Sequence, residues 1–322
     1  MNDTNQSCVI CANTSGNVIH LTREMMFGTR ESFRYLECGA CRCLMLLDAP
    51  ADMSRHYPSG YYAYARDRGI KAIVRTARAR FAAGHLSPLG WLVTVVFGPD
   101  YTMRSIGNAA ISHSDRVLDV GCGSGQLLSI MHALGYRDLN GVDPFIDADI
   151  EDKNGIRIRK AHLSEITQRY DVIMFNHSFE HMSDPVAVFA DLKRLLAPGG
   201  RVLIRIPVAC SAAWQRFGVH WVHLDPPRHL FIHSTQSVDL LARGAGLEIT
   251  SMVYEGNASQ FIGSEQYERG ISHNDPRSFY SGGWRRWAYW LRMWMLEARA
   301  EKLNRDGKGD WMRFELRSQL ND

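Results

Sequence analysis

The feature that most constrains this chain is the segment VLDVGCGSGQLL, residues 117–128. Aliphatic residues lead into three glycines at alternate positions, and a second apolar run follows the last of them. Glycine can adopt positive φ and lets a backbone approach a ligand closely where a helix begins. The segment therefore predicts a buried strand, a helix, and between them a tight ligand-facing turn formed by Gly121, Gly123 and Gly125.

The same turn lacks the residues that bind a pyrophosphate. A dinucleotide fingerprint would place its third glycine at Gln126, and a phosphate loop would need a lysine followed by serine or threonine there. Acidic residues remain: Asp119 precedes the turn, and Asp143 ends the next predicted strand, where an acid can bind both ribose hydroxyls. Uncharged glycines beside two acids favour a phosphate-free nucleoside that carries an ammonium group, such as S-adenosylmethionine.

Strand-like and helix-like segments alternate from Asp115 onward, which is typical of a parallel sheet covered by helices. We therefore expect an α/β fold with a doubly wound, mostly parallel, Rossmann-like sheet and a helical insertion at about 257–309 before the last strand. Strands are predicted at 116–120, 138–143, 155–161, 170–176, 199–207, 247–254 and 310–318, and helices at 125–134, 185–196 and 234–245.

Four of the seven cysteines form two C-x2-C pairs near the start of the chain. Two such pairs present four thiolates in the arrangement of a structural zinc ribbon. A redox pair would lie at the start of a helix, and no helix signal follows either pair. We expect one structural zinc bound by Cys8, Cys11, Cys38 and Cys41, with Cys43 as a less usual replacement for Cys41. The expected domains are then a zinc-ribbon-like unit at 1–50, a helical linker or cap at 51–110, and the α/β domain at 111–322.

Residues 112–256 resemble the class I S-adenosylmethionine-dependent methyltransferases. The motifs that carry the resemblance are VLDVGCGSG, GVDP, YDVIMFNHSFEHMSDP and LLAPGGRVLIRIP. The resemblance implies that Asp119 and the glycines hold the methionine part of the cofactor and that Asp143 holds its ribose. It further implies that the floor near the sulfonium is lined by Asn176, Ser178 and Phe179. The adenine would be contacted by His162 or by the backbone of Leu163.

A four-cysteine ribbon joined to such a domain resembles enzymes of bacterial deoxysugar and surface-polysaccharide biosynthesis, as does the segment HLDPPRHLFIHSTQSVDLLARGAGL. The resemblance implies methyl transfer to a sugar in a nucleotide-linked or glycan acceptor. Sugar C-methyltransferases of this kind carry a further C-terminal domain, for which this chain is too short. We therefore expect methylation of a hydroxyl oxygen, with carbon methylation as an alternative.

Methylation of a hydroxyl requires a group that accepts its proton, and histidine is the usual base near neutral pH. Histidines gather at 220–233 and 177–181, after two predicted strands and so at the sheet edge where ligands bind. We rank the candidate bases in the order His229, His181, and then Glu180 and His223.

A metal site formed by His229, His233 and Asp225 is a lower-ranked alternative, because Pro226 and Pro227 prevent the continuous helix that would align the two histidines. His233 precedes a predicted helix cap. We therefore expect it to be a surface or packing residue.

The net charge of +3 is too small to indicate a nucleic-acid partner. An RNA methyltransferase whose zinc unit docks the nucleic acid is therefore an alternative only, as is a binding module that has lost the reaction. The longest apolar run, 89–97, is too short to span a bilayer, and no signal segment opens the chain. We expect a cytoplasmic chain.

Two further stretches bear on partners. Tryptophans recur at helical spacing over 284–294, which favours docking to the core or a homodimer face over peripheral membrane contact. Basic residues are concentrated in the stretch 66–80. This pattern favours a solvent-exposed helix face over a binding site for an anionic acceptor.

Overall fold

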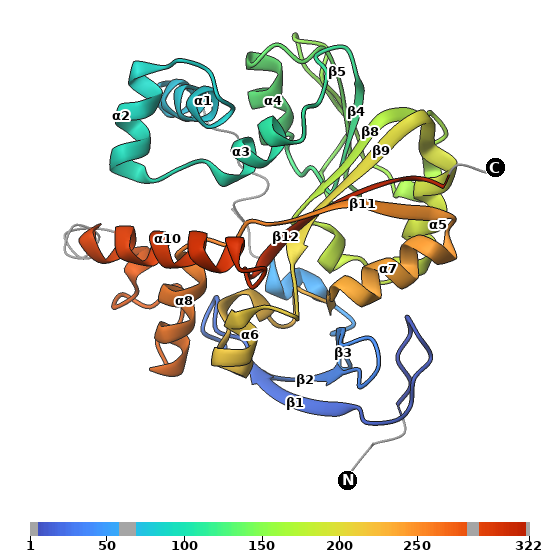
Figure 1. The fold of residues 1–322 in the computed structure, drawn as a ribbon, viewed down its shortest axis with the longest axis vertical. Coiled ribbons are helices and arrows are strands. Elements are labelled where there is room, and N and C mark those ends of the chain that lie inside the picture. Colours follow the sequence, from blue (N-terminus) through green and yellow to red (C-terminus); the bar gives the residue numbers. More distant parts are fainter. Residues whose placement is uncertain (1–5, 58–68, 282–289, 320–322) are drawn as a thin grey trace.

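The computed structural model describes residues 6–57, 69–281 and 290–319, and its centre is an eight-stranded sheet (Figure 1). The strand order is β11-β12-β9-β8-β4-β5-β7-β6. Pairing is parallel from β9 through β8, β4 and β5 to β7, whereas β12 runs antiparallel to both β9 and β11. The strands are β4 (Arg116–Val120), β5 (Asp138–Val142), β6 (Ile150–Glu151), β7 (Arg157–Arg159), β8 (Tyr170–Asn176), β9 (Leu196–Pro207), β11 (Leu247–Tyr254) and β12 (Trp311–Ser318).

Helices cover both faces of this sheet, so its strands are buried on each side. Val117 of β4 packs with α4 (Gln126–Ala133) in one core, whereas Leu118 packs with α5 (Pro185–Leu195) and α7 (Thr235–Gly244) in the other. Alternate side chains of one strand point to opposite faces, so consecutive apolar residues are what a doubly covered strand requires. The predicted α/β, doubly wound, mostly parallel fold is confirmed.

Two boundaries differ from the prediction. β9 begins at Leu196 rather than at the predicted residue 199, so residues 197–198, between the predicted helix and strand, already belong to the strand. β7 covers only Arg157–Arg159 of the expected 155–161, because β6 pairs with it in a short antiparallel hairpin.

The N-terminal part of the chain forms a second, four-stranded sheet of order β1-β2-β3-β10. β10 comes from the segment that follows β9 and pairs antiparallel with β3. The cysteine-bearing unit therefore takes its last strand from the segment in which the sequence predicts the catalytic base. These strands are β1 (Val18–Arg23), β2 (Ser32–Glu37), β3 (Leu44–Leu46) and β10 (Phe231–Ile232).

Shorter helices complete the described chain. The α-helices are α1 (Ile70–Ala82), α2 (Pro88–Phe97), α3 (Tyr101–Asn108), α6 (Ala212–Phe217), α8 (Ser259–Glu268) and α10 (Trp290–Arg305). The 3-10 turns are η1 (Met53–His56), η3 (Leu163–Glu165), η4 (Phe179–His181), η5 (Gly218–His220), η6 (Val222–Leu224) and η7 (Phe279–Ser281). Over the described ranges, no helix combines the length and the apolarity needed to cross a membrane.

The helical insertion before β12 packs against the second sheet. Leu296 and Ala300 of α10 share a buried cluster with residues of α6, α8, β2 and β3. Trp294 of the same helix is 44% exposed. Trp284 and Trp287 lie outside the described residues, and so do Arg66 and Arg68 of the basic stretch.

Candidate functional site

The glycine turn after β4 has the backbone that the sequence predicts. Gly121, Gly123 and Gly125 have φ of +73°, +52° and +77°, a region that L side chains rarely adopt. A Cβ on Gly121 would lie 2.5 Å from the Cβ of Ser178, so even alanine would collide there. The turn thus needs glycine both for its conformation and for the close approach of the segment after β8.

Two buried carboxyl groups lie beside this turn. Asp143, at the end of β5, accepts hydrogen bonds from the backbone N–H groups of Gly123 and Phe145, both at 2.9 Å. Asp119 is only 3% exposed, and burial followed by the charge of Asp143 raises its pKa to about 8. A cationic ligand that also carries hydroxyl groups would reduce the unfavourable interaction between these two carboxyl groups.

The other residues predicted to bind the cofactor take different positions. Ser178 donates its hydroxyl to the carbonyl of Val120 at 2.5 Å, and Asn176 accepts a hydrogen bond from Arg205 at 3.2 Å. The ring of Phe179 is fully buried between Phe175, Phe189 and His233, so the structure gives it a packing role. His162 and Leu163 follow β7 at the same edge of the sheet, and His162 caps η3.

The predicted bases come together next to this edge. One ligand atom from each of Glu180, His181 and His229 lies within 4.8 Å of the others, although His229 is 48 residues further along the chain. Each imidazole is fixed through Nδ1, which donates at 2.8 Å to a backbone carbonyl: His181 to Arg228 and His229 to His223. Both Nε2 atoms therefore keep a lone pair that can accept a proton.

Burial determines the charge of this histidine–glutamate cluster, formed by Glu180, His181 and His229. Desolvation raises the pKa of Glu180 to about 8 and lowers that of His229 to about 3, and it lowers the pKa of His181 as well. Neither carboxyl oxygen of Glu180 has a hydrogen-bond partner among the described residues. Near neutral pH the cluster therefore combines neutral imidazoles with a buried carboxyl group that is mainly protonated and that, once ionised, can compensate a positive charge.

Two residues outside the ranked bases touch this cluster. His177, at φ +56°, places Nδ1 3.5 Å from Oε1 of Glu180 and accepts a hydrogen bond of 2.6 Å from Arg205 at Nε2. Tyr57 follows η1 and places its hydroxyl 3.4 Å from Nδ1 of His181. The position of His177 directly after a strand was a usable signal, whereas nothing local marks Tyr57.

His223 is the one predicted base that lies in a different set of contacts. Its Nδ1 lies 2.7 Å from Oδ2 of Asp310, and its Nε2 lies 3.3 Å from the hydroxyl of Ser259. Both ring nitrogens are thus already engaged. Its backbone carbonyl, which holds His229, is its direct link to the histidine–glutamate cluster.

The four predicted zinc ligands also come together. Their sulfur atoms lie within 4.8 Å of one another, with Cys8 3.6 Å from Cys41 and Cys11 3.5 Å from Cys38. The hydrogen bond between Cys8 and Cys41 lowers the pKa of Cys8 and raises that of Cys41, and burial raises the pKa of Cys11. The set fits a tetrahedral zinc, and Cys43 is not part of it.

The lower-ranked metal site does not form. Asp225 is paired with Arg228 at 2.5 Å, and His233 is stacked between Phe179 and Phe231. Among the described residues, the groups with metal-ligand spacing are the four cysteines and the histidine–glutamate cluster.

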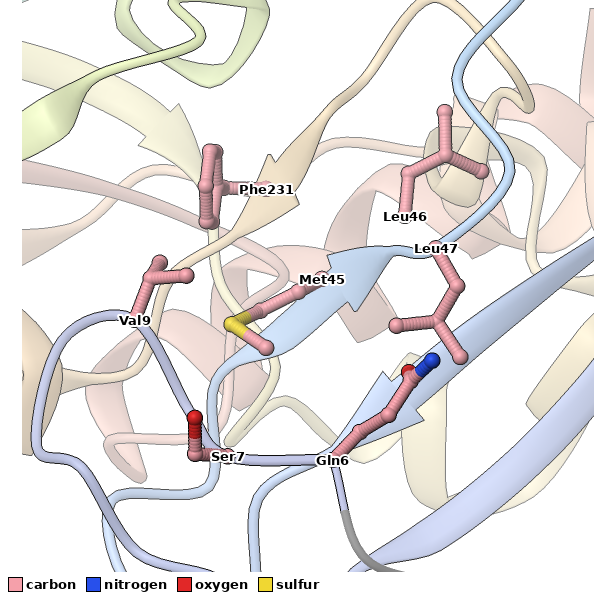
Figure 2. A pocket seen from close by; sticks show the side chains of 7 residues that line it. All are labelled: Gln6, Ser7, Val9, Met45, Leu46, Leu47 and Phe231. Atoms are coloured by element: carbon pink, nitrogen blue, oxygen red, sulfur yellow. The ribbon is translucent and has the colours of Figure 1, made fainter. Parts of the chain in front are cut away.

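A groove of about 420 Å³ lies on the cysteine-bearing unit, next to the cysteine cluster (Figure 2). None of its lining residues is a predicted site residue; they are Gln6, Ser7, Val9, Met45, Leu46, Leu47 and Phe231. A second cavity of about 20 Å³ lies beneath Asn176 and Arg205, which is room for about one water.

Residues 97–252 match the family model described as a methyltransferase domain. This range, just under half of the chain, is thus similar to methyltransferase domains. Every predicted cofactor-binding residue and candidate base lies inside the matched range. The resemblance to methyltransferases is thereby confirmed, whereas the resemblance to deoxysugar and polysaccharide enzymes stays a prediction.

Curated relatives of this methyltransferase domain include two proteins named ubiquinone biosynthesis O-methyltransferase. That of Proteus mirabilis (strain HI4320) is 32% identical over 110 residues, which cover 31% of this chain and 44% of that protein. That of Xanthomonas oryzae pv. oryzae (strain PXO99A) is 29% identical over 165 residues, covering 44% and 66%. The match thus spans less than two thirds of either relative's length.

Solved structures with a similar fold include geranyl diphosphate C-methyltransferase from Streptomyces coelicolor A3(2), at a TM-score of 0.46 and 15% identity, covering 74% of this chain and 87% of that one. The cyclopropane synthase MmaA2 from Mycobacterium tuberculosis gives a TM-score of 0.43 and 15% identity, covering 72% and 85%.

Proposed function

We propose that the protein is an S-adenosylmethionine-dependent O-methyltransferase that uses the histidine–glutamate cluster to accept the proton of a hydroxyl group. The observation that carries this proposal is the arrangement of Glu180, His181 and His229, of which the first two follow shortly after Ser178, the residue that contacts the glycine turn. Both imidazoles offer Nε2, and the buried carboxyl group can balance the charge that either gains. The O-methyltransferase names of the relatives support oxygen rather than carbon as the methylated atom.

The residues around the turn fit the cofactor. Asp119 would bind its ammonium group, Asp143 its ribose hydroxyls, and the glycines would allow it to lie against the backbone. When bound, the cofactor supplies a methyl group on a sulfonium. The chain itself has to orient the acceptor, exclude water and accept a proton at Nε2 of His229 or His181, because an in-line displacement depends mainly on positioning.

We further propose a sugar hydroxyl, in a nucleotide-linked sugar or a glycan, as the acceptor, and one structural zinc in the cysteine cluster. The four-cysteine unit beside the domain supports this acceptor through the family resemblance in the sequence. A second candidate is a phenolic hydroxyl, because the curated relatives are named for ubiquinone biosynthesis. Labelled methyl transfer into sugar nucleotides, lipid-linked glycans, quinol precursors and RNA would separate these acceptors.

The proposed base is tested by His229→Ala and His181→Ala. We expect at least one variant to lose about 100-fold or more in kcat while its affinity for S-adenosylmethionine is unchanged. His113→Ala is the matched control, because His113 is exposed and packs against Tyr136 instead. Turnover within about twofold of the wild type in both variants would remove the histidines from this role.

A further inference from the structure

The helix α2 carries an exposed apolar face. Leu89, Leu92 and Val96 are spaced i, i+3 and i+7, so they share one side of the helix, and they are 49%, 53% and 42% exposed. Trp91 beside them is 56% exposed, and Leu86 just before the helix is completely exposed. Figure 1 shows α2 at the outer edge of the molecule, next to α1.

The packing of α2 explains why its large side chains point outward. Its buried side is formed by Gly90 and Val93. A Cβ on Gly90 would lie 2.1 Å from the carbonyl oxygen of Ala77 in α1, so the two helices touch through small residues. The contact with α1 therefore leaves about half of Leu89, Trp91 and Leu92 exposed.

The charge around this face has one sign. Residues 69–99 contain four Lys and Arg residues and no Asp or Glu. Lys71 and Arg80 of α1 are exposed, and Arg78 pairs with Asp100, the acid that caps α3, at 3.7 Å. An apolar helix face in a segment with an excess of cations, whose neighbouring acid Asp100 is already paired with Arg78, matches the surface of an anionic membrane, where Trp and Leu enter the interface and Lys and Arg bind headgroups.

We propose that the α1–α2 hairpin, residues 70–97, docks the protein on anionic lipid headgroups, with Leu89, Trp91 and Leu92 in the interface. A second copy is the less suitable occupant, because a two-fold contact brings the same face together and would oppose the cations of the two hairpins. The hairpin precedes the matched methyltransferase range almost entirely. It is therefore a feature of this chain rather than of the domain.

Vesicle flotation of the full chain tests the proposal without cofactor or acceptor, so the result does not depend on the proposed function. We expect flotation with vesicles of phosphatidylcholine and about 30% phosphatidylglycerol, and much less with phosphatidylcholine alone. The double variants Leu89→Gln/Leu92→Gln and Lys71→Gln/Arg80→Gln should each bind about tenfold or more weakly. Phe145→Gln and Lys153→Gln alter exposed residues elsewhere and should bind as the wild type does.

Fluorescence quenching by brominated acyl chains provides a second measurement that requires no destabilising change. Trp91→Phe keeps the face apolar, so it should still float but should lose a clear part of the quenching. The proposal is wrong if the wild type does not float with anionic vesicles, or if quenching is the same in Trp91→Phe. It is also wrong if sedimentation shows a lipid-free dimer that Leu89→Gln/Leu92→Gln dissociates, because a second copy would then cover the face.

Discussion

The hydroxyl of Tyr35 donates a hydrogen bond of 2.6 Å to the backbone carbonyl of His229. Tyr35 is buried in β2 of the cysteine-bearing unit, whereas His229 lies between β9 and β10. The neighbouring Arg228 is fully buried and pairs with Glu24 of the same unit at 3.1 Å. The N-terminal unit therefore holds the segment that presents the proposed base.

Tyr35→Phe should lower kcat without changing the affinity for S-adenosylmethionine. It removes one hydrogen bond worth about 1 kcal/mol, which corresponds to about fivefold in rate if the bond positions His229 in the transition state. Tyr170→Phe is the control, because Tyr170 is equally buried but lies at the opposite end of β8 from the site. Isothermal titration and initial rates measure both quantities, and an unchanged kcat in Tyr35→Phe would show that the bond is only structural.

Asp119→Asn should bind S-adenosylmethionine about tenfold or more weakly, because a charge-assisted hydrogen bond contributes about 1.5–3 kcal/mol. Burial and Asp143 raise the pKa of Asp119 to about 8, so wild-type affinity should increase as pH rises towards that value. The variant should lose this increase. Asp138→Asn changes an acid at the other end of β5 and serves as the control in calorimetry at several pH values. Equal pH dependence in the wild type and Asp119→Asn would contradict the assignment.

Much of the sheet was predictable because its signals are local. Val117 and Leu118 predict a strand buried on both faces, and the glycines after them allow the positive φ that a tight turn requires. The acids at strand ends were predictable for the same reason, since parallel strands bring their carboxyl ends to one edge.

The supporting contacts were not predictable, since they depend on long-range pairing. Tyr35 and His229 are 194 residues apart and meet only because β10, a strand of two residues, joins β3. No hydrophobic period can mark so short a strand. Phe179 illustrates a different limit of sequence-based prediction. After a predicted strand, the sequence pattern is the same for an aromatic residue buried in the core and for one that faces a cofactor.

Zinc analysis of protein purified without chelator should give one ion per chain. Cys11→Ser should lower the zinc content and also kcat, because the cysteine unit carries β3 and Cys41 accepts a hydrogen bond of 2.5 Å from Ser234. Cys210→Ser removes a thiol outside the cluster and should retain both zinc and activity. Zinc-free wild-type protein with full activity would refute both the metal and its supporting role.

The rate should depend on the ionisation of Glu180. Burial raises the pKa of this carboxyl group to about 8, so below that pH it is mainly protonated and cannot balance an imidazolium. The pKa of His229 is lowered to about 3, so His229 stays neutral over the same range. We therefore expect kcat to rise from pH 6 to about 8 and then to level off. Glu180→Gln should be slower and should lack this rise, and a rise that persists in the variant would assign it to another group.

Stability in mild acid should depend on His233. Its ring is fully buried and stacked on Phe179 and Phe231, and burial lowers its pKa to about 3 from an ordinary value of 6.5. A depressed pKa means that the folded state binds the proton less well than the unfolded state does. The neutral ring therefore makes its full contribution to the free energy of unfolding above pH 6.5, and this contribution is lost as pH falls. The loss is about 1.4 kcal/mol per pH unit, or about 2 kcal/mol at pH 5.

His233→Phe preserves the stack and removes the titrating group. Its free energy of unfolding should therefore fall by about 2 kcal/mol less than that of the wild type between pH 7 and pH 5. Urea unfolding at the two pH values measures the difference, in which the other buried histidines cancel because both proteins contain them. His85→Gln, at an exposed position, should follow the wild type. If His233→Phe loses as much stability as the wild type, the ring of His233 takes up a proton without unfolding the chain, and the packing role assigned to it is wrong.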